Sequence, residues 1–161
     1  MEVKLAIKIY SSVIDLMKLF MKKEIDNLYS DVITEALTYF PQEYLTETVI
    51  PKALEFSSVE ENLTTRRIAV HVFGQLSKVI DDASVYVQRI LPRAVTFYHD
   101  LNYDLRRIIC CYSHKILTLL NSLLEVEPEN KEVKLYRESI LRLVCDLIED
   151  DEATVKTAAF L

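Results

Sequence analysis

The side chains in this sequence that could perform catalysis or bind a metal are few and widely spaced. The histidines are His71, His99 and His114, and no two of them have the His-x-x-x-His spacing of a helical zinc site. Cys110 and Cys111 are adjacent, which does not match the Cys-x-x-Cys spacing of a metal site or redox motif. We therefore interpret the histidines as ordinary helix residues and expect no metal and no cofactor.

The cysteines could still form a reactive thiol site. Arg106 and Arg107 lie one helical turn before Cys110 and Cys111 and could lower a thiol pKa. The surrounding residues are apolar, however, and in such a helix a cysteine behaves as a small hydrophobic residue. With Cys145 the count is odd, which indicates a reduced compartment rather than a disulfide framework. We favour core packing for these residues and expect a cytoplasmic location.

Two pairs of acids, Asp81-Asp82 and Asp150-Asp151, could act in metal binding or in general acid–base catalysis. Both pairs lie at expected helix boundaries, where acidic side chains favour the N-terminus of the following helix. We interpret them as structural and expect no catalytic residue. The chain is thus predicted not to be an enzyme, although a helical enzyme remains the alternative class.

Composition narrows the classes of protein further. The 161 residues include one Gly, four Pro and no Trp, and half of them are hydrophobic. Gly74 alone cannot supply the turns of a β-sandwich or a Gly-rich phosphate site. The net charge of −6 disfavours nucleic-acid binding, which requires phosphate neutralisation. No apolar run is long enough to span a membrane, so we expect no membrane insertion.

The elements that must position these residues are helices. Apolar residues recur with helical period, and the sequence predicts helices over residues 3–21, 24–40, 42–56, 64–80, 85–99, 105–124, 134–148 and from about 154. Pro51 and Pro92 lie inside two of these helices and should bend them. Thr64 or Thr65 is the expected N-cap of its helix.

A repeated pattern runs through three blocks of the sequence. In each block an acidic residue precedes a basic residue by six positions, and the pairs are Glu60 with Arg66, Asp100 with Arg106, and Asp150 with Lys156. The first two acids are 40 residues apart and the next two 50, with the loop at 125–131 absorbing the difference. Each acid could pair with the basic residue of its own or the next repeat and so form a ladder of structural pairs.

A period near 40 with two helices per unit is typical of HEAT or armadillo repeats, whose helix pairs must stack to bury their apolar faces. The sequence therefore predicts an all-α fold, an α-α superhelix (solenoid) of about four stacked helix pairs. It forms a single segment, 1–161, with units at about 3–40, 42–80, 84–124 and 132–161. The first unit lacks the signature, and the third block has Arg142 where the others have Pro. We expect the last unit to be cut short and the segment to belong to a longer solenoid.

The pattern of a proline, then an acidic residue and then a basic residue resembles the HEAT family across residues 42–161. Further matching segments are Phe40-Pro41-Gln42-Glu43, Val49-Ile50-Pro51, Gln75-Leu76-Ser77-Lys78, Arg89-Ile90-Leu91-Pro92 and Val155-Lys156-Thr157-Ala158-Ala159-Phe160. Their order is similar to that in the regulatory and scaffold subunits of type 2A-like serine/threonine phosphatases. The resemblance implies a non-catalytic subunit whose turns within each repeat bind a phosphatase catalytic subunit.

The expected partner-binding residues are those of the turns: Glu60, Glu61, Asn62, Asp100, Asn102, Tyr103, Asp150 and Asp151. Solvated turns with structural acids are the simpler interpretation of the same residues. A nuclear-transport or vesicle-coat adaptor with HEAT repeats is the alternative function.

Overall fold

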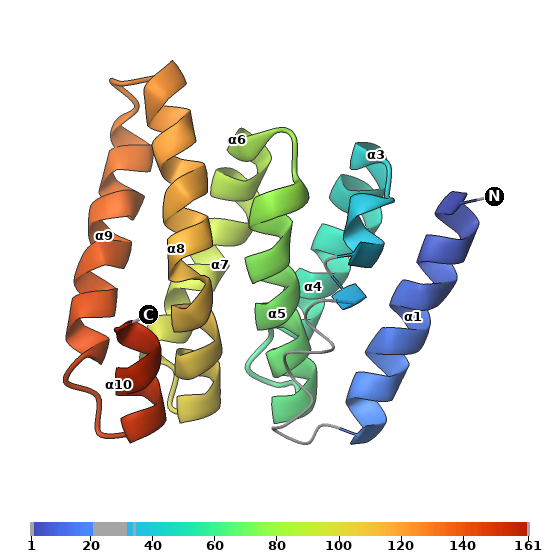
Figure 1. Cartoon of the computed structure of the whole chain (residues 1–161), viewed down its shortest axis with the longest axis horizontal. Helices are drawn as coiled ribbons and strands as arrows, with labels where there is room; N and C mark the ends of the chain where they lie inside the picture. The colour runs from blue at the N-terminus through green and yellow to red at the C-terminus, as the bar shows by residue number, and fades with distance from the viewer. Residues whose placement is uncertain (1, 21–31, 34, 161) are drawn as a thin grey trace. The chain divides into compact units, whose positions relative to one another are not determined.

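The structure, a computed structural model, is all-helical in the residues that it describes, which are 2–20, 32–33 and 35–160 (Figure 1). The prediction of an all-α fold is confirmed. Most of the helix expected over 24–40 lies outside the described residues. The contacts divide the chain into two compact units, residues 1–81 and 82–161, and each is described by itself. Their boundary falls between the expected helix pairs 42–80 and 84–124.

The first unit contains one long helix, a helix with a π turn, and a buried helix. Its elements are α1 (Glu2–Phe20), α3 (Gln42–Tyr44), η2 (Leu45–Val49), α4 (Ile50–Phe56) and α5 (Leu63–Val79). α3, η2 and α4 follow one another without a break, so residues 42–56 form a single helical rod, as the sequence predicts. α4 and α1 both contact α5. The core includes Ile50, Ile68 and Phe73, whose side chains are completely buried.

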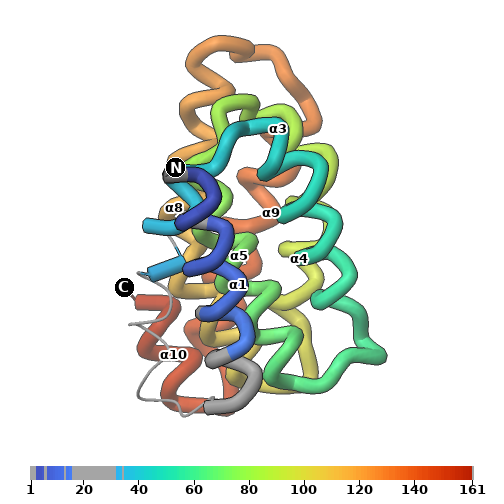
Figure 2. The backbone as a smooth tube through the Cα atoms, turned by 90° about the vertical axis from the view of Figure 1, so that its right-hand side faces the viewer, coloured from blue at the N-terminus to red at the C-terminus, as the bar shows by residue number. Residues whose placement is uncertain are grey.

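The second unit is built around α8. Its elements are α6 (Ala83–Val85), η3 (Tyr86–Ile90), α7 (Leu91–Ala94), η4 (Val95–His99), α8 (Tyr103–Val126), α9 (Lys131–Leu147) and α10 (Ala153–Ala159). η4, α9 and α10 all contact α8. α10 lies against the half of α8 that contains its N-terminus (Figures 1 and 2). The helices expected here are present, with ends within a few residues of the predicted ones.

The two interior prolines are accommodated by π turns. Residues 45–49 and 86–90 are π-helical, and in each case the proline follows after one further residue. The amide of Ile50 donates to the carbonyl of Leu45, and that of Leu91 donates to Tyr86, five residues back. The sequence predicted a disturbance of the helix at these prolines, described as a bend, and did not predict a π turn.

A second repeated feature follows each proline. Both helices continue as Pro-(Lys/Arg)-Ala-x-x-Phe. The Lys52 ammonium lies 4.8 Å from the centre of the Phe56 ring, and the Arg93 guanidinium lies 5.2 Å from that of Phe97. Such cation–π contacts contribute about 0.5–1 kcal/mol at exposed sites. The two helices thus share their packing as well as their spacing.

Asparagine side chains cap helices in both units. The side-chain oxygen of Asn62 accepts a hydrogen bond from the amide of Thr65 at 3.0 Å, so Asn62 is the N-cap of α5 and Thr65 is its partner. The expectation that Thr64 or Thr65 is the cap was wrong by two or three positions. Asn130 caps α9 in the same way, accepting from Val133 at 3.1 Å.

Gln42 joins the beginning of one helix to the end of another. Its amide nitrogen donates to the carbonyl of Val79 at 2.9 Å, and its side-chain oxygen accepts from the amide of Asp81 at 3.0 Å. These bonds satisfy backbone groups just where α5 ends, which otherwise would have no helical partner. One side chain therefore fixes where the chain leaves the first unit.

Candidate functional site

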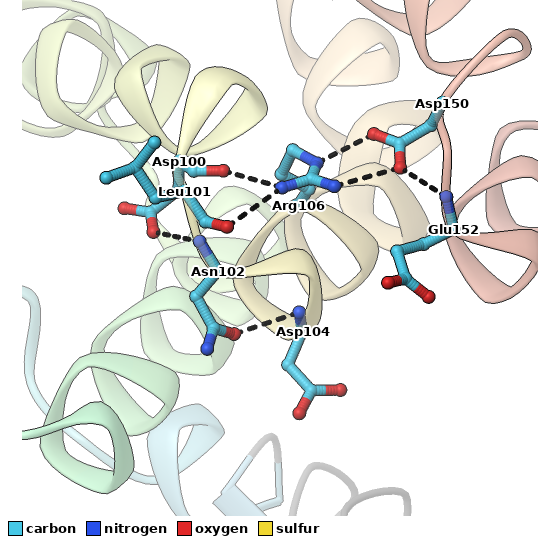
Figure 3. A network of polar contacts seen from close by, with 7 residues as sticks. All are labelled: Asp100, Leu101, Asn102, Asp104, Arg106, Asp150 and Glu152. Atoms are coloured by element: carbon cyan, nitrogen blue, oxygen red, sulfur yellow. Dashed lines mark hydrogen bonds and ion pairs between the residues drawn. The ribbon is translucent and has the colours of Figure 1, made fainter.

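The polar centre of the second unit is Arg106, in the first turns of α8 (Figure 3). Its Nε donates to Asp150 Oδ2 at 2.7 Å, and its Nη2 donates to Asp150 Oδ1 at 2.9 Å. Its Nη1 donates to the carbonyl of Asp100 at 2.8 Å and to that of Leu101 at 3.3 Å. One guanidinium thereby connects the turn before α8 with the turn before α10. We call these four contacts the Arg106 brace.

The Arg106 brace is largely shielded from solvent. The side chain of Arg106 is 16% exposed and that of Asp150 is 6% exposed. The hydrogen bonds from Arg106 lower the pKa of Asp150, and the same bonds raise the pKa of Arg106. Two-pronged hydrogen bonding between a guanidinium and a carboxylate is stronger and more directional than an ordinary surface ion pair. The brace therefore holds two turns in a defined relation.

The acids in these turns also shape the backbone locally. Asp100 Oδ1 accepts from the amide of Asn102 at 2.9 Å, and Asp150 Oδ1 accepts from the amide of Glu152 at 2.9 Å. Asn102 in turn caps α8, because its side-chain oxygen accepts from the amide of Asp104 at 3.0 Å. Asp100 and Asp150 occupy matching positions and form matching turns.

The sequence suggested that each acid pairs with the basic residue of its own or the next repeat, and for Asp150 both alternatives are wrong. Asp150 is bound by Arg106 of the preceding block and not by Lys156 of its own block. Lys156 acts only through its charge, which helps to lower the pKa of Asp150. A lysine ammonium cannot make the two parallel bonds with which a guanidinium holds a carboxylate.

The other two expected pairs also differ from the prediction. Arg106 binds the backbone carbonyl of Asp100, while the Asp100 carboxylate accepts from a backbone amide. The side chain of Glu60 is exposed, and in the described part of the chain no hydrogen bond or ion pair joins it to Arg66. The repeated spacing of six residues therefore marks where the turn and the helix begin rather than a pair of side chains in contact.

An open, acidic groove lies beside the brace, within the second unit. It is lined by Tyr98, His99, Asp100, Leu101, Arg106, Leu143, Asp146, Leu147, Glu149, Asp150 and Asp151. The carboxylates outnumber the single guanidinium, and Asp146, Glu149 and Asp151 are exposed. Leu101 is fully exposed at the tip of its turn. The surface combines negative charge with one apolar side chain.

The expected partner-binding residues are only partly brought together. Asp100, Asp150 and Asp151 line the groove, but Asp150 is held by Arg106. Asn102 caps α8, and Tyr103 is that helix's first residue and is half-buried. In the first unit, Asn62 caps α5, while Glu60 is exposed and Glu61 half-buried in the preceding turn.

Sequence reasoning missed Asp146 as a groove residue. It lies near the end of α9, three residues before Glu149, and therefore on the same side of the chain as Glu149. The expectation was confined to the turns themselves, whereas the end of the preceding helix contributes to the same surface. The signal that could have found Asp146 is its three-residue spacing from Glu149.

The residues considered for catalysis are dispersed. His71 is buried in α5, whereas His99 and His114 are exposed, and His99 lines the groove. Cys110 is 4% exposed, and burial raises its pKa to about 11. Cys111 is exposed, although partial desolvation raises its pKa as well. Among the described residues, no three His, Cys, Asp or Glu side chains form a group that could hold a metal ion.

No family model, no curated protein and no solved structure matches the chain. None of the described helices combines the length and apolarity that crossing a bilayer requires. The function is accordingly inferred from the residues of the chain itself.

Proposed function

We propose that the chain is a non-catalytic binding protein, a HEAT-type scaffold or regulatory subunit whose turns contact a protein partner. The observation that carries this proposal is that one helix design is used twice. In each unit a π turn, a proline and a cation–π contact occur at the same spacing, and an Asn cap then starts the next helix. Repetition of one design is typical of solenoids, whose binding surfaces consist of corresponding parts of successive repeats.

The groove of the second unit indicates the kind of partner segment. Asp150 is already neutralised by Arg106. Asp146, Glu149 and Asp151 lie at the end of α9 and in the following turn, and among the described residues no side chain forms an ion pair with them. A segment with basic side chains and one apolar residue would match these carboxylates and Leu101. Complementary charge of this kind increases association rates and selects among partners.

The class of partner is proposed from the resemblance of the sequence to known phosphatase subunits. The chain's order of segments resembles that in the scaffold and regulatory subunits of type 2A-like serine/threonine phosphatases, among them regulatory subunit 4 of protein phosphatase 4. We therefore propose that a phosphatase catalytic subunit in the cytoplasm binds the turns. In this proposal the chain positions that enzyme and supplies no group to the chemistry.

A capture experiment with purified components tests the partner class. The tagged chain is mixed with type 2A-like phosphatase catalytic subunits, with a nuclear-transport GTPase, and with vesicle-coat subunits, each in a separate reaction. The proposal predicts capture of a phosphatase subunit and of neither of the others. Capture of a transport or coat component alone would favour the adaptor function and overturn the phosphatase assignment.

Two matched triple variants locate the surface. Each removes three negative charges from exposed residues. The groove variant is D146N/E149Q/D151N, and the control variant is E125Q/E132Q/E138Q, on the far end of α8 and on α9. The groove variant should bind the phosphatase more weakly than the control variant. Equal binding by both variants would place the contact elsewhere on the chain.

A further inference from the structure

In the part of the chain that the structure describes, the two π turns occur in the two helices with an interior proline, and the equivalent helix without a proline, α9, has no π turn. Pro51 and Pro92 each stand two residues after the last π-helical residue, Val49 and Ile90 respectively. In α9, Arg142 occupies the matching position, and α9 is a regular α-helix from Lys131 to Leu147. The chain thus contains two examples and one internal comparison.

The covalent structure of proline explains why a regular helix is unfavourable at these points. Proline has no amide hydrogen, and its ring collides with the carbonyl four residues earlier. That carbonyl belongs to Glu47 for Pro51 and to Gln88 for Pro92, and both of these residues are exposed. One π turn widens the helix there, and carbonyls that lose an amide partner on this side can bind water.

The extra residue in a π turn also changes which side chains face the core. Leu45 and Val49, the first and last residues of the first π turn, are buried, and so are Ile50 and Ala53, which follow it. In α9, by contrast, the buried residues Val133, Ile140 and Leu147 are spaced by seven, which is close to two turns of a regular helix. In the proline-containing helix of the first unit, buried side chains thus lie both before and after the point where the π turn ends.

We propose that Pro51 and Pro92 are conformational devices that set a one-residue shift of helical register in the first helix of their pair. The shift belongs to the free protein and requires no partner. It is independent of the proposed phosphatase function, because it follows from hydrogen bonds within single helices. Without the proline, the amide of residue 50 or 91 should return to the carbonyl four residues earlier.

Single variants of the full chain test this device by crystallography or by NMR couplings across hydrogen bonds. In Pro51→Ala, the amide of Ile50 should lose its bond to Leu45 and donate to Thr46. In Pro92→Ala, the amide of Leu91 should likewise move from Tyr86 to Val87. Alanine favours helix and both positions are exposed, so these variants should fold. Pro128→Ala, in the loop between α8 and α9, is the control that should leave both π turns unchanged.

Arg142→Pro provides the converse experiment. It should create a π turn over residues 136–140 of α9, which are now α-helical. Persistence of the Leu45 and Tyr86 hydrogen bonds in the two alanine variants would overturn the proposal and assign the register to core packing. A folded Arg142→Pro protein that bends without a π turn would contradict it as well. Should Arg142→Pro fail to fold, the alanine variants alone decide.

Discussion

Removal of Arg106 should destabilise the second unit more than removal of an ordinary surface arginine. The guanidinium makes two bonds to the Asp150 carboxylate, at 2.7 and 2.9 Å, and a third at 2.8 Å to the carbonyl of Asp100. Exposed ion pairs contribute about 0–1 kcal/mol, and breaking a fully buried pair costs about 3–5 kcal/mol. Because the two side chains are 16% and 6% exposed, Arg106→Ala should lie between these limits, at about 2–3 kcal/mol.

A double-mutant cycle separates the ion pair from the other roles of its members. Asp150→Ala also removes the turn bond to the amide of Glu152, but that loss occurs in both the single and the double variant and cancels. The coupling free energy between Arg106 and Asp150 should be about 1–2 kcal/mol. Denaturant unfolding followed by circular dichroism measures it, with amide exchange in α10 as a local readout of the second unit. A coupling below about 0.5 kcal/mol would show that the brace is no stronger than a surface pair.

Three further predictions concern single groups. The pKa of Asp150 is lowered in the folded state, so its charge stabilises the fold above the unfolded pKa of about 3.9, and this stabilisation is lost as the pH falls below that value. The difference in unfolding free energy between wild type and Asp150→Asn should therefore be constant above about pH 5 and shrink below about pH 4. Tyr98→Phe removes the buried 2.7 Å hydrogen bond with Ser113 and should lower the free energy of unfolding by about 1 kcal/mol in the same denaturation assay. Cys110 should react with a thiol reagent at pH 8 more slowly than the exposed cysteines, because it is 4% exposed and its pKa is raised to about 11; a mass-spectrometric time course in which it reacts first would contradict its burial.

The helices could be predicted from sequence because their apolar residues follow one simple period. Leu105, Ile109, Ile116 and Leu120, for example, recur on one face of α8 and are all buried. The π turns could not be predicted in the same way. A proline indicates that a helix is disturbed, but a kink, a break and a π turn can each accommodate its missing amide hydrogen and the bulk of its ring.

The side-chain contacts were harder to predict than the helices. The spacing of Asp150 and Lys156 suggested a pair, but spacing says nothing about what a neighbouring turn brings close. The two turns meet because α10 contacts α8, and Arg106 then competes for Asp150 with the better geometry. Asn62 and Asn102, which were expected to bind a partner, are also helix caps, a role that was not predicted for them, because an exposed turn and an N-cap favour the same residue types.

Calorimetric titration of a type 2A-like phosphatase catalytic subunit into the purified chain is the most direct test of the proposed function. Wild type and the control variant E125Q/E132Q/E138Q should show saturable binding with the same affinity. The groove variant D146N/E149Q/D151N should bind at least about tenfold more weakly, which corresponds to about 1.4 kcal/mol, and its binding should depend less on salt than that of wild type. Absence of binding by the wild-type chain, or equal affinity for all three proteins, would contradict the proposal that the acidic groove binds this partner.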